Sequence, residues 1–200
     1  MFNLMHITII LIISYMLGSI NASVVIGKIK GIDIRDYGSN NAGFTNAVRI
    51  LGFSYAVLVL LCDAFKTVIA IILAKNILPN NILSTYLSGI GTVLGHNFPI
   101  YFNFKGGKGV VVSIVSMLFA NWLIGIVVII FSASIMFFTR YISLGSIIGC
   151  MIVIIISFVF KWGDWNYMMF ALSLSSLALY MHRGNIKRLI ARTEKKINIK

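Results

Sequence analysis

Residues 105–109 read KGGKG and stand directly before an apolar run that begins at Val110. Glycines let backbone N–H groups approach an anion closely, and lysines supply the countercharge. The first turn of a helix adds free N–H groups and the positive end of the helix dipole. The segment therefore predicts a phosphate site. It is not a Walker A loop, which needs G-x-x-x-x-G-K-[ST] after a strand, so ATP hydrolysis is unsupported.

Two further polar segments carry the same kinds of residue. Residues 30–52 read KGIDIRDYGSNNAGFTNAVRILG, a stretch rich in Gly and Asn between two apolar runs. Residues 181–196 read MHRGNIKRLIARTEKK. Amides and hydroxyls donate hydrogen bonds to phosphate oxygens, while Arg and Lys balance the charge. Three such segments predict a site for anionic substrates if they meet on one side of a membrane.

The composition predicts a membrane protein. Of the 200 residues 59% are hydrophobic, only 11% are charged and two are proline, which is far too apolar for an ordinary soluble domain. The net charge of +12 does not indicate nucleic acid as a partner, because so hydrophobic a chain offers no soluble basic domain. Charge here reports orientation and anionic partners.

The apolar runs give the number of membrane spans. Runs 3–27, 110–139 and 141–160 are about as long as, or longer than, the roughly 20 residues that cross a bilayer. Runs 50–74 and 82–98 predict two more helices. Run 110–139 is either one long tilted helix or two short helices broken near 120–122, so the total is six or seven.

The positive-inside rule favours seven, because six helices leave one basic group on the outer side. With seven, only Lys75 and Lys161 face outward. The basic residues then placed on the cytoplasmic face are Lys28, Lys30, Arg35, Arg49, Lys105, Lys108, Arg140 and the seven in the tail. The prediction is an all-α integral membrane protein, a bundle of seven transmembrane helices with the N-terminus outside and the C-terminus cytoplasmic. Residues 1–182 form a single transmembrane domain with catalytic cytoplasmic loops 28–50 and 98–109, and residues 183–200 form a basic cytoplasmic tail.

Several chemistries are excluded or disfavoured. Acyltransferases that use thioester donors employ H-x-x-x-x-D, but the fifth residues after His6, His96 and His182 are Leu11, Tyr101 and Lys187. Neither a metal site nor a cofactor is predicted, since the two cysteines are isolated in apolar runs and the histidines are far apart. What remains is an activated donor whose leaving group is phosphate.

Two charged residues inside the second helix predict a structural feature. Asp63 and Lys66 stand three apart, so they share a helix face and form an ion pair. His96, at the cytoplasmic end of the third helix, is expected to donate to a loop carbonyl.

Three motifs resemble those of the acylphosphate-dependent glycerol-3-phosphate acyltransferases of bacteria, the PlsY type, over nearly the whole chain. The first resembles GSIP followed by G-S-G-N-x-G-A-T-N-x-x-R, and here reads GSIN at 18–21 and GSNNAGFTNAVR at 38–49. The second resembles G-H-x-F-P-x-F-x-x-F-K-G-G-K-G and reads GHNFPIYFNFKGGKG at 95–109. The third resembles H-R-x-N-I-x-R-L-x-x-G-T-E and reads HRGNIKRLIARTE at 182–194.

The resemblance implies seven spans, location in the bacterial cell membrane and one reaction. A fatty acyl group passes from acyl phosphate to the 1-hydroxyl of glycerol 3-phosphate, giving lysophosphatidic acid and phosphate. The implied partners are these two substrates and membrane lipids, with no cofactor and no metal.

The site residues follow from the resemblance and from their chemistry. The catalytic set is Ser39, Arg49, Lys105, Lys108, His182 and Asn185. The substrate- and phosphate-binding set is Asn41, Gly43, Thr45, Asn46, Gly106, Gly107, Gly109, Arg188 and Glu194. The proton acceptor stays open between His182, whose ordinary pKa suits a general base, and a phosphate oxygen of the substrate. The other reading of His182 is a hydrogen bond at the membrane surface.

Five positions depart from the family motifs. They are Asn21 for Pro, Asn40 for Gly, Phe44 for Ala, Thr67 for the Gly that follows the helix-two lysine, and Arg192 for Gly. Asparagine tolerates the left-handed conformation, so Asn40 is expected to keep the loop shape. A bulky Phe44 ring in a phosphate cradle would narrow it, which predicts a divergent paralogue with altered donor, acceptor or rate.

Two alternative functions use the same basic loops. One is a small membrane transporter for organic phosphates, although polar residues in the middle of the spans are few. The other is a non-catalytic binder of organic phosphates or anionic lipid head groups.

Overall fold

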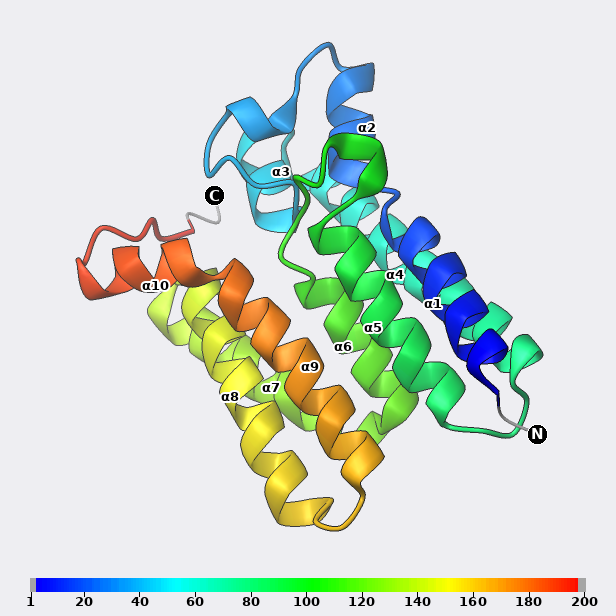
Figure 1. Cartoon of the computed structure of the whole chain (residues 1–200). Helices are drawn as coiled ribbons and strands as arrows, with labels where there is room; N and C mark the ends of the chain where they lie inside the picture. Colours follow the sequence, from blue (N-terminus) through cyan, green and yellow to red (C-terminus); the bar gives the residue numbers. More distant parts are fainter. Residues whose placement is uncertain (1–2, 198–200) are drawn as a thin grey trace. The chain divides into compact units, whose positions relative to one another are not determined.

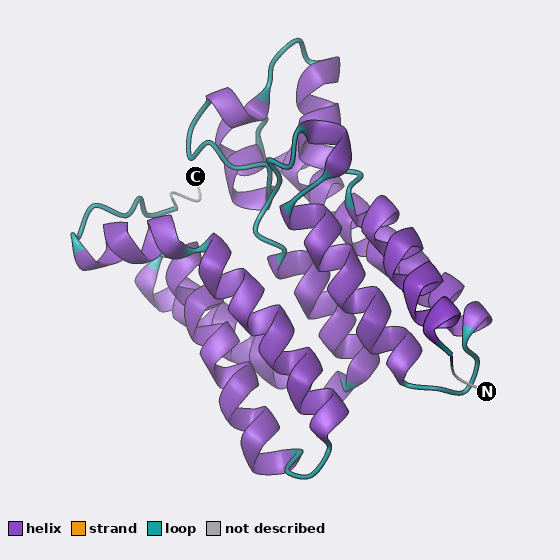
Figure 2. Ribbon diagram, viewed as in Figure 1, coloured by secondary structure: helices purple, strands orange, loops and turns teal. Residues whose placement is uncertain are grey.

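The computed structural model describes residues 3–197, and within that range it contains helices, turns and loops but no strand (Figure 2). The predicted all-α class is confirmed. The chain forms two compact units, the first ending at Ser116 and the second beginning at Met117. Each unit is described by itself.

The first unit holds the two polar loops between its helices (Figure 1). Its elements are α1 (Leu4–Gly18), α2 (Ala22–Ile29), the 3-10 turn η1 (Ile34–Asp36), α3 (Phe44–Ile50), α4 (Phe53–Ile77), α5 (Leu83–Asn97), the 3-10 turn η2 (Ile100–Phe102) and most of α6 (Val110–Ala120). The short helix α3 lies in the polar stretch 30–52, and it packs on α4.

The second unit holds four helices. They are α7 (Trp122–Thr139), α8 (Ile142–Phe160), α9 (Trp165–Met181) and α10 (Arg183–Ile190). The predicted break in run 110–139 is confirmed at Asn121, whose side chain accepts a hydrogen bond from the N–H of Ile124 at 3.1 Å and begins α7. The tail begins with the helix α10, which was not predicted.

The first apolar run differs from its prediction as a single helix. It is two helices, α1 and α2, interrupted at residues 19–21. Asn21 has extended backbone angles, and its side chain accepts from the N–H of Val24 at 3.2 Å, which starts a new helix. The periodicity of an apolar run does not reveal a cap of this kind inside it.

Among residues 3–197, four helical segments are long and apolar enough to cross a membrane: Leu4–Ile29, Phe53–Ile77, Trp122–Thr139 and Ile142–Phe160. The apolar helices α5, α6 and α9 are shorter, with 15, 11 and 17 residues. A helix of 20 residues spans about 30 Å, so these three are shorter than the hydrocarbon core is thick.

Small residues let α1 pack closely on α5. The hydroxyl of Ser14 donates to that of Ser88 at 3.0 Å across the two helices. A Cβ added at Gly95 would overlap the carbonyl oxygen of Tyr15 and lie 2.8 Å from the nitrogen of Ser19. Close approach at small residues is how helices associate in a membrane, where apolar burial contributes little. Gly95 belongs to the second motif, so its place there is structural.

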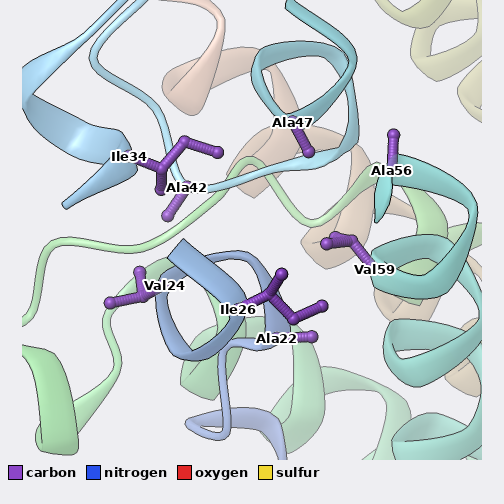
Figure 3. Packing of buried hydrophobic residues seen from close by; sticks show 8 residues of the cluster. All are labelled: Ala22, Val24, Ile26, Ile34, Ala42, Ala47, Ala56 and Val59. Carbon is purple, nitrogen blue, oxygen red and sulfur yellow. The ribbon is translucent and has the colours of Figure 1, made fainter. Parts of the chain in front are cut away.

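A buried apolar cluster lies under the first polar loop (Figure 3). Its members are Ala22, Val24 and Ile26 of α2, Ile34 of η1, Ala42 of the loop, Ala47 of α3, and Ala56 and Val59 of α4. Because one loop residue is fully buried in this cluster, the loop is fixed to the helices beneath it.

Candidate active site

Arg35 joins the two polar loops of the first unit. Its guanidinium pairs with Asp33 at 2.6 Å and donates through Nη1 to the carbonyls of Phe102 at 2.8 Å and Lys105 at 3.2 Å. The hydrogen bond from Arg35 lowers the pKa of Asp33 to about 2, so the pair is charged at any physiological pH. Neither residue was predicted to matter, because an Asp and an Arg two apart in a loop carry no recognisable spacing.

Asn46 holds the first motif in shape from below. Its side chain is fully buried, with Nδ2 donating to the carbonyls of Ile34 and Tyr37 at 2.9 and 3.0 Å. Its Oδ1 accepts from the N–H of Ser39 at 2.9 Å. Both ends of the amide are therefore engaged with the backbone. In the structure Asn46 positions the backbone of Ser39, and its contact with substrate stays a prediction.

The glycines of KGGKG press against the end of α5. The N–H of Gly106 donates to the carbonyl of Asn97 at 3.2 Å, and that of Gly107 to the carbonyl of His96 at 3.0 Å. A Cβ on Gly107 would overlap His96 Nε2 and lie 2.7 Å from the carbonyl oxygen of Ala42. These two amides cap α5. Close packing at these two glycines brings Gly107 against the first motif, and their binding of phosphate stays a prediction.

Gly109 has a different role from Gly106 and Gly107. Its φ of 73° lies in the left-handed region that favours glycine, so it allows the backbone to turn. It ends the loop directly before α6. The two lysines that precede this turn differ in exposure: Lys105 is exposed, and Lys108 is half-buried.

The predicted ion pair of Asp63 with Lys66 is confirmed, with 2.7 Å between Nζ and Oδ1. Both side chains are buried, and Lys66 Nζ also donates to the carbonyl of Ile20 at 2.7 Å. Nδ1 of His96 lies 3.0 Å from the same Nζ, so the ring contacts this cluster through Nδ1. Thr67 is buried and donates to the carbonyl of Asp63 at 2.7 Å. The family position after the lysine thus holds a helix-internal hydrogen bond here.

The remaining predicted residues of the first motif lie around α3. Ser39, Asn41, Thr45 and Arg49 are half-buried, and Gly43 is buried as the residue that precedes the helix.

Glu194 organises the third motif within the second unit. Its carboxylate accepts from Asn185 Nδ2 at 2.7 Å and from the Ser143 hydroxyl at 2.9 Å through Oε1, and from Arg188 Nε at 2.6 Å through Oε2. Burial raises the pKa of Glu194, but the hydrogen bonds from Asn185, Arg188 and Ser143 outweigh it and hold the pKa below its ordinary value. Ser143 was not predicted, since it lies in α8 and no motif includes it.

His182 is buried at the junction of α9 and α10. Its Nδ1 lies 2.8 Å from the carbonyl oxygen of Ala178, which only accepts, so Nδ1 carries the proton. In the neutral ring the lone pair is then on Nε2. This tautomer suits a general base.

Two of the departures have left-handed backbones, Asn40 with φ 56° and Arg192 with φ 57°. The prediction for Asn40 is confirmed, and its Nδ2 donates to the carbonyl of Arg35 at 2.9 Å. The third departure, Phe44, packs its ring against the apolar cluster of Figure 3. The ring thus contributes to the packing beneath the loop, and its effect on a phosphate cradle stays a prediction.

The structure thus brings the first two motifs together in the first unit, while the third forms its own hydrogen-bonded cluster in the second. Among residues 3–197 no group of three or more His, Cys, Asp or Glu side chains is placed to hold a metal ion.

A family model described as "Glycerol-3-phosphate acyltransferase" matches residues 8–192. The chain belongs to the glycerol-3-phosphate acyltransferase family. A glycerol-3-phosphate acyltransferase of Thermoanaerobacter sp. (strain X514) is 39% identical over 190 residues, covering 94% of each chain. One from Shouchella clausii (strain KSM-K16) is 42% identical over 194 residues, covering 93% of each chain.

Solved structures of the same family resemble this fold. A crystal structure of PlsY, an integral membrane glycerol 3-phosphate acyltransferase in its glycerol 3-phosphate form, superposes with a TM-score of 0.88 at 34% identity and 96% coverage of each chain. Its lysophosphatidic acid form gives a TM-score of 0.84 at 33% identity. This chain is therefore an all-helical integral membrane protein.

Proposed function

We propose that this protein transfers a fatty acyl group from acyl phosphate to the 1-hydroxyl of glycerol 3-phosphate in a bacterial cell membrane. The observation that supports it most is the contact between the first two motifs, where Gly107 lies against Ala42 and Arg35 ties the loops together. Half-buried Arg49 and Lys108 belong to these packed loops. Two basic loops held together offer countercharge for a phosphate substrate and a phosphate leaving group.

The proposed topology has seven spans with the loops and tail on the cytoplasmic side. The helices α5, α6 and α9 would be the short spans, accommodated by local thinning or by burial against neighbours. Orientation follows the excess of Lys and Arg in the loops after α2 and α5 and in the tail.

In the proposed reaction the 1-hydroxyl oxygen attacks the acyl carbonyl carbon. The bond between that carbon and the phosphate oxygen breaks, and inorganic phosphate leaves with the electron pair. The hydroxyl proton passes to His182 Nε2 or to a phosphate oxygen of the substrate. With an activated donor, positioning of the two reactants contributes much of the rate. Lys108 and Lys105 would stabilise negative charge on the carbonyl or the departing phosphate.

The binding roles divide by region. Ser39, Asn41 and Thr45 would donate to a phosphate, with Arg49 as its countercharge. In the second unit Asn185 and Arg188 would contact substrate while Glu194 holds both in place.

The test is an assay of the purified protein in detergent or vesicles. Acyl phosphate with glycerol 3-phosphate should yield lysophosphatidic acid and phosphate in equal amounts, and acyl thioester should not replace the donor. A transporter would instead move glycerol 3-phosphate into sealed vesicles without product. Binding without either outcome would indicate a non-catalytic relative and overturn the proposal.

A further inference from the structure

Asn21 stands where the family motif has proline, at the break between α1 and α2. The side chain is buried, with 1% of its surface exposed. Its Oδ1 accepts from the N–H of Val24 at 3.2 Å and from the Ser23 hydroxyl at 2.8 Å. The oxygen therefore caps α2, as asparagine commonly does at a helix start.

The nitrogen of the same amide reaches a different part of the chain. Nδ2 donates to the carbonyl oxygen of Ala42 at 3.1 Å, across 21 positions of sequence. Ala42 lies between Asn41 and Gly43 in the first motif and is fully buried. Proline has no side-chain donor, so this bond is specific to chains that carry a donor at position 21.

The Ala42 carbonyl is also the atom that faces the second motif. A Cβ on Gly107 would lie 2.7 Å from it. A rotation of the 42–43 peptide would therefore break the bond to Asn21 and also change the contact between the two loops. The orientation of this carbonyl therefore determines the backbone orientation of Asn41 and of the residues that begin α3.

We propose that Asn21 is a positioning residue for the substrate-binding loop 38–46, acting through the Ala42 carbonyl. Proline at this position would restrict the backbone between α1 and α2, whereas Asn21 restrains the chain by its hydrogen bond to the Ala42 carbonyl. Asn21 contacts no substrate in this proposal. The expected change in KM rests on the proposed function, whereas the expected change in hydrogen exchange of residues 38–46 does not.

The decisive variant is Asn21→Ser, because serine is also a strong N-cap but is too short to reach Ala42. The matched control is Asn121→Ser, which keeps the same cap chemistry at the start of α7 and alters no contact of the loop. Asn21→Asp is the second variant: its carboxylate keeps the cap and loses the donor.

In Asn21→Ser we expect the KM for the substrate that loop 38–46 binds, either glycerol 3-phosphate or acyl phosphate, to rise about tenfold. This is the size expected for loss of one hydrogen bond. The KM for the other substrate and the melting temperature should stay as in Asn121→Ser. Hydrogen exchange of the backbone amides at 38–46 should become faster in Asn21→Ser and stay unchanged in Asn121→Ser.

Unchanged KM values together with unchanged exchange at 38–46 in both Asn21 variants would overturn the inference. A lower melting temperature with unchanged kinetics of the folded protein would also overturn it, since Asn21 would then serve stability alone. If the unaltered protein forms no lysophosphatidic acid, the proposed function fails, and the exchange measurement still decides the role of Asn21.

Discussion

The loops of the first unit and the tail of the second carry similar polar residues but hold them by different forces. In the first unit the motifs are fixed mainly by buried amides and by glycine backbone packed on helix ends, as with Asn46 and Gly107, beside the Arg35–Asp33 ion pair. In the second a single carboxylate, Glu194, gathers Asn185 and Arg188. Buried neutral contacts respond to volume and shape, whereas an ionic cluster responds to pH and salt. The two regions should therefore fail in different ways.

The largest expected effect contrasts a lysine proposed to stabilise transition-state charge, Lys108, with a substrate-contacting arginine that is already paired with a carboxylate, Arg188. Lys108→Ala should lower kcat by about 10²- to 10³-fold, the range found when one group that stabilises transition-state charge is removed. Arg188→Ala should lower kcat only about tenfold, because the charge of Arg188 is already partly balanced by Glu194. The hydrogen bond from Asn185 to Glu194 would remain in this variant. Steady-state rates of lysophosphatidic acid formation measure both. Equal losses in the two variants would remove the distinction between the regions.

The shape-dependence of the first region is tested by Gly107→Ala. The new Cβ would overlap His96 Nε2 and crowd the Ala42 carbonyl, so we expect activity to fall about 100-fold, as small misplacements in a site can cause. The control is Gly184→Ala in α10, where the nearest atom to a Cβ is Arg188 Nη1 at an ordinary 3.5 Å. Activity and melting temperature of both variants should be compared, and an active Gly107→Ala would contradict the packing role.

The pH-dependence of the second region is tested by Glu194→Gln. The folded-state pKa of Glu194 lies below the ordinary 4.5, so the carboxylate contributes stability that is complete above that value and is lost as pH falls through the folded-state pKa. The melting temperature of the variant should be lower than that of the unaltered protein at neutral pH, and the gap should close on acidification below 4.5.

Asp33→Asn supplies the matching measurement in the first region. The pKa of Asp33 is lowered from 3.8 to about 2, so its contribution to stability should be complete above 3.8 and be lost as the pH falls toward 2. A gap between Glu194→Gln and the unaltered protein that stays constant down to pH of about 3 would contradict the assignment of Glu194.

The smallest expected effect compares one left-handed residue from each region. Arg192→Gly should stabilise the protein by less than about 1 kcal/mol, because relief of strain is partly offset by the larger unfolded-state entropy of glycine. Asn40→Gly should give no gain, since asparagine tolerates this backbone and its bond to the Arg35 carbonyl is lost. Chemical unfolding of the two variants measures the difference, and a larger gain at position 40 would reverse the argument.

The sequence predicted the all-helical membrane fold because long apolar runs leave few other structures, and it located the break at Asn121. It did not predict the break at Asn21, which lies inside an apolar run. The motifs indicated which segments hold the candidate site. They did not indicate which atoms the motif residues contact, because those contacts depend on the fold. Asn46 and Gly107 are bonded to backbone that a sequence does not display. Ser143 and Arg35 belong to the clusters only through bonds that link positions 51 and 67 apart.

The capping of α2 by Asn21 also leaves a backbone carbonyl available to the buried ammonium of Lys66. Inside an uninterrupted helix the Ile20 carbonyl would accept from the N–H of Val24, but that N–H is bonded to the Asn21 side chain. The carbonyl instead accepts from the ammonium of Lys66. A main-chain oxygen thus accepts a hydrogen bond from this ammonium as water does at a protein surface, which helps a lysine–aspartate pair to persist in a buried position between helices.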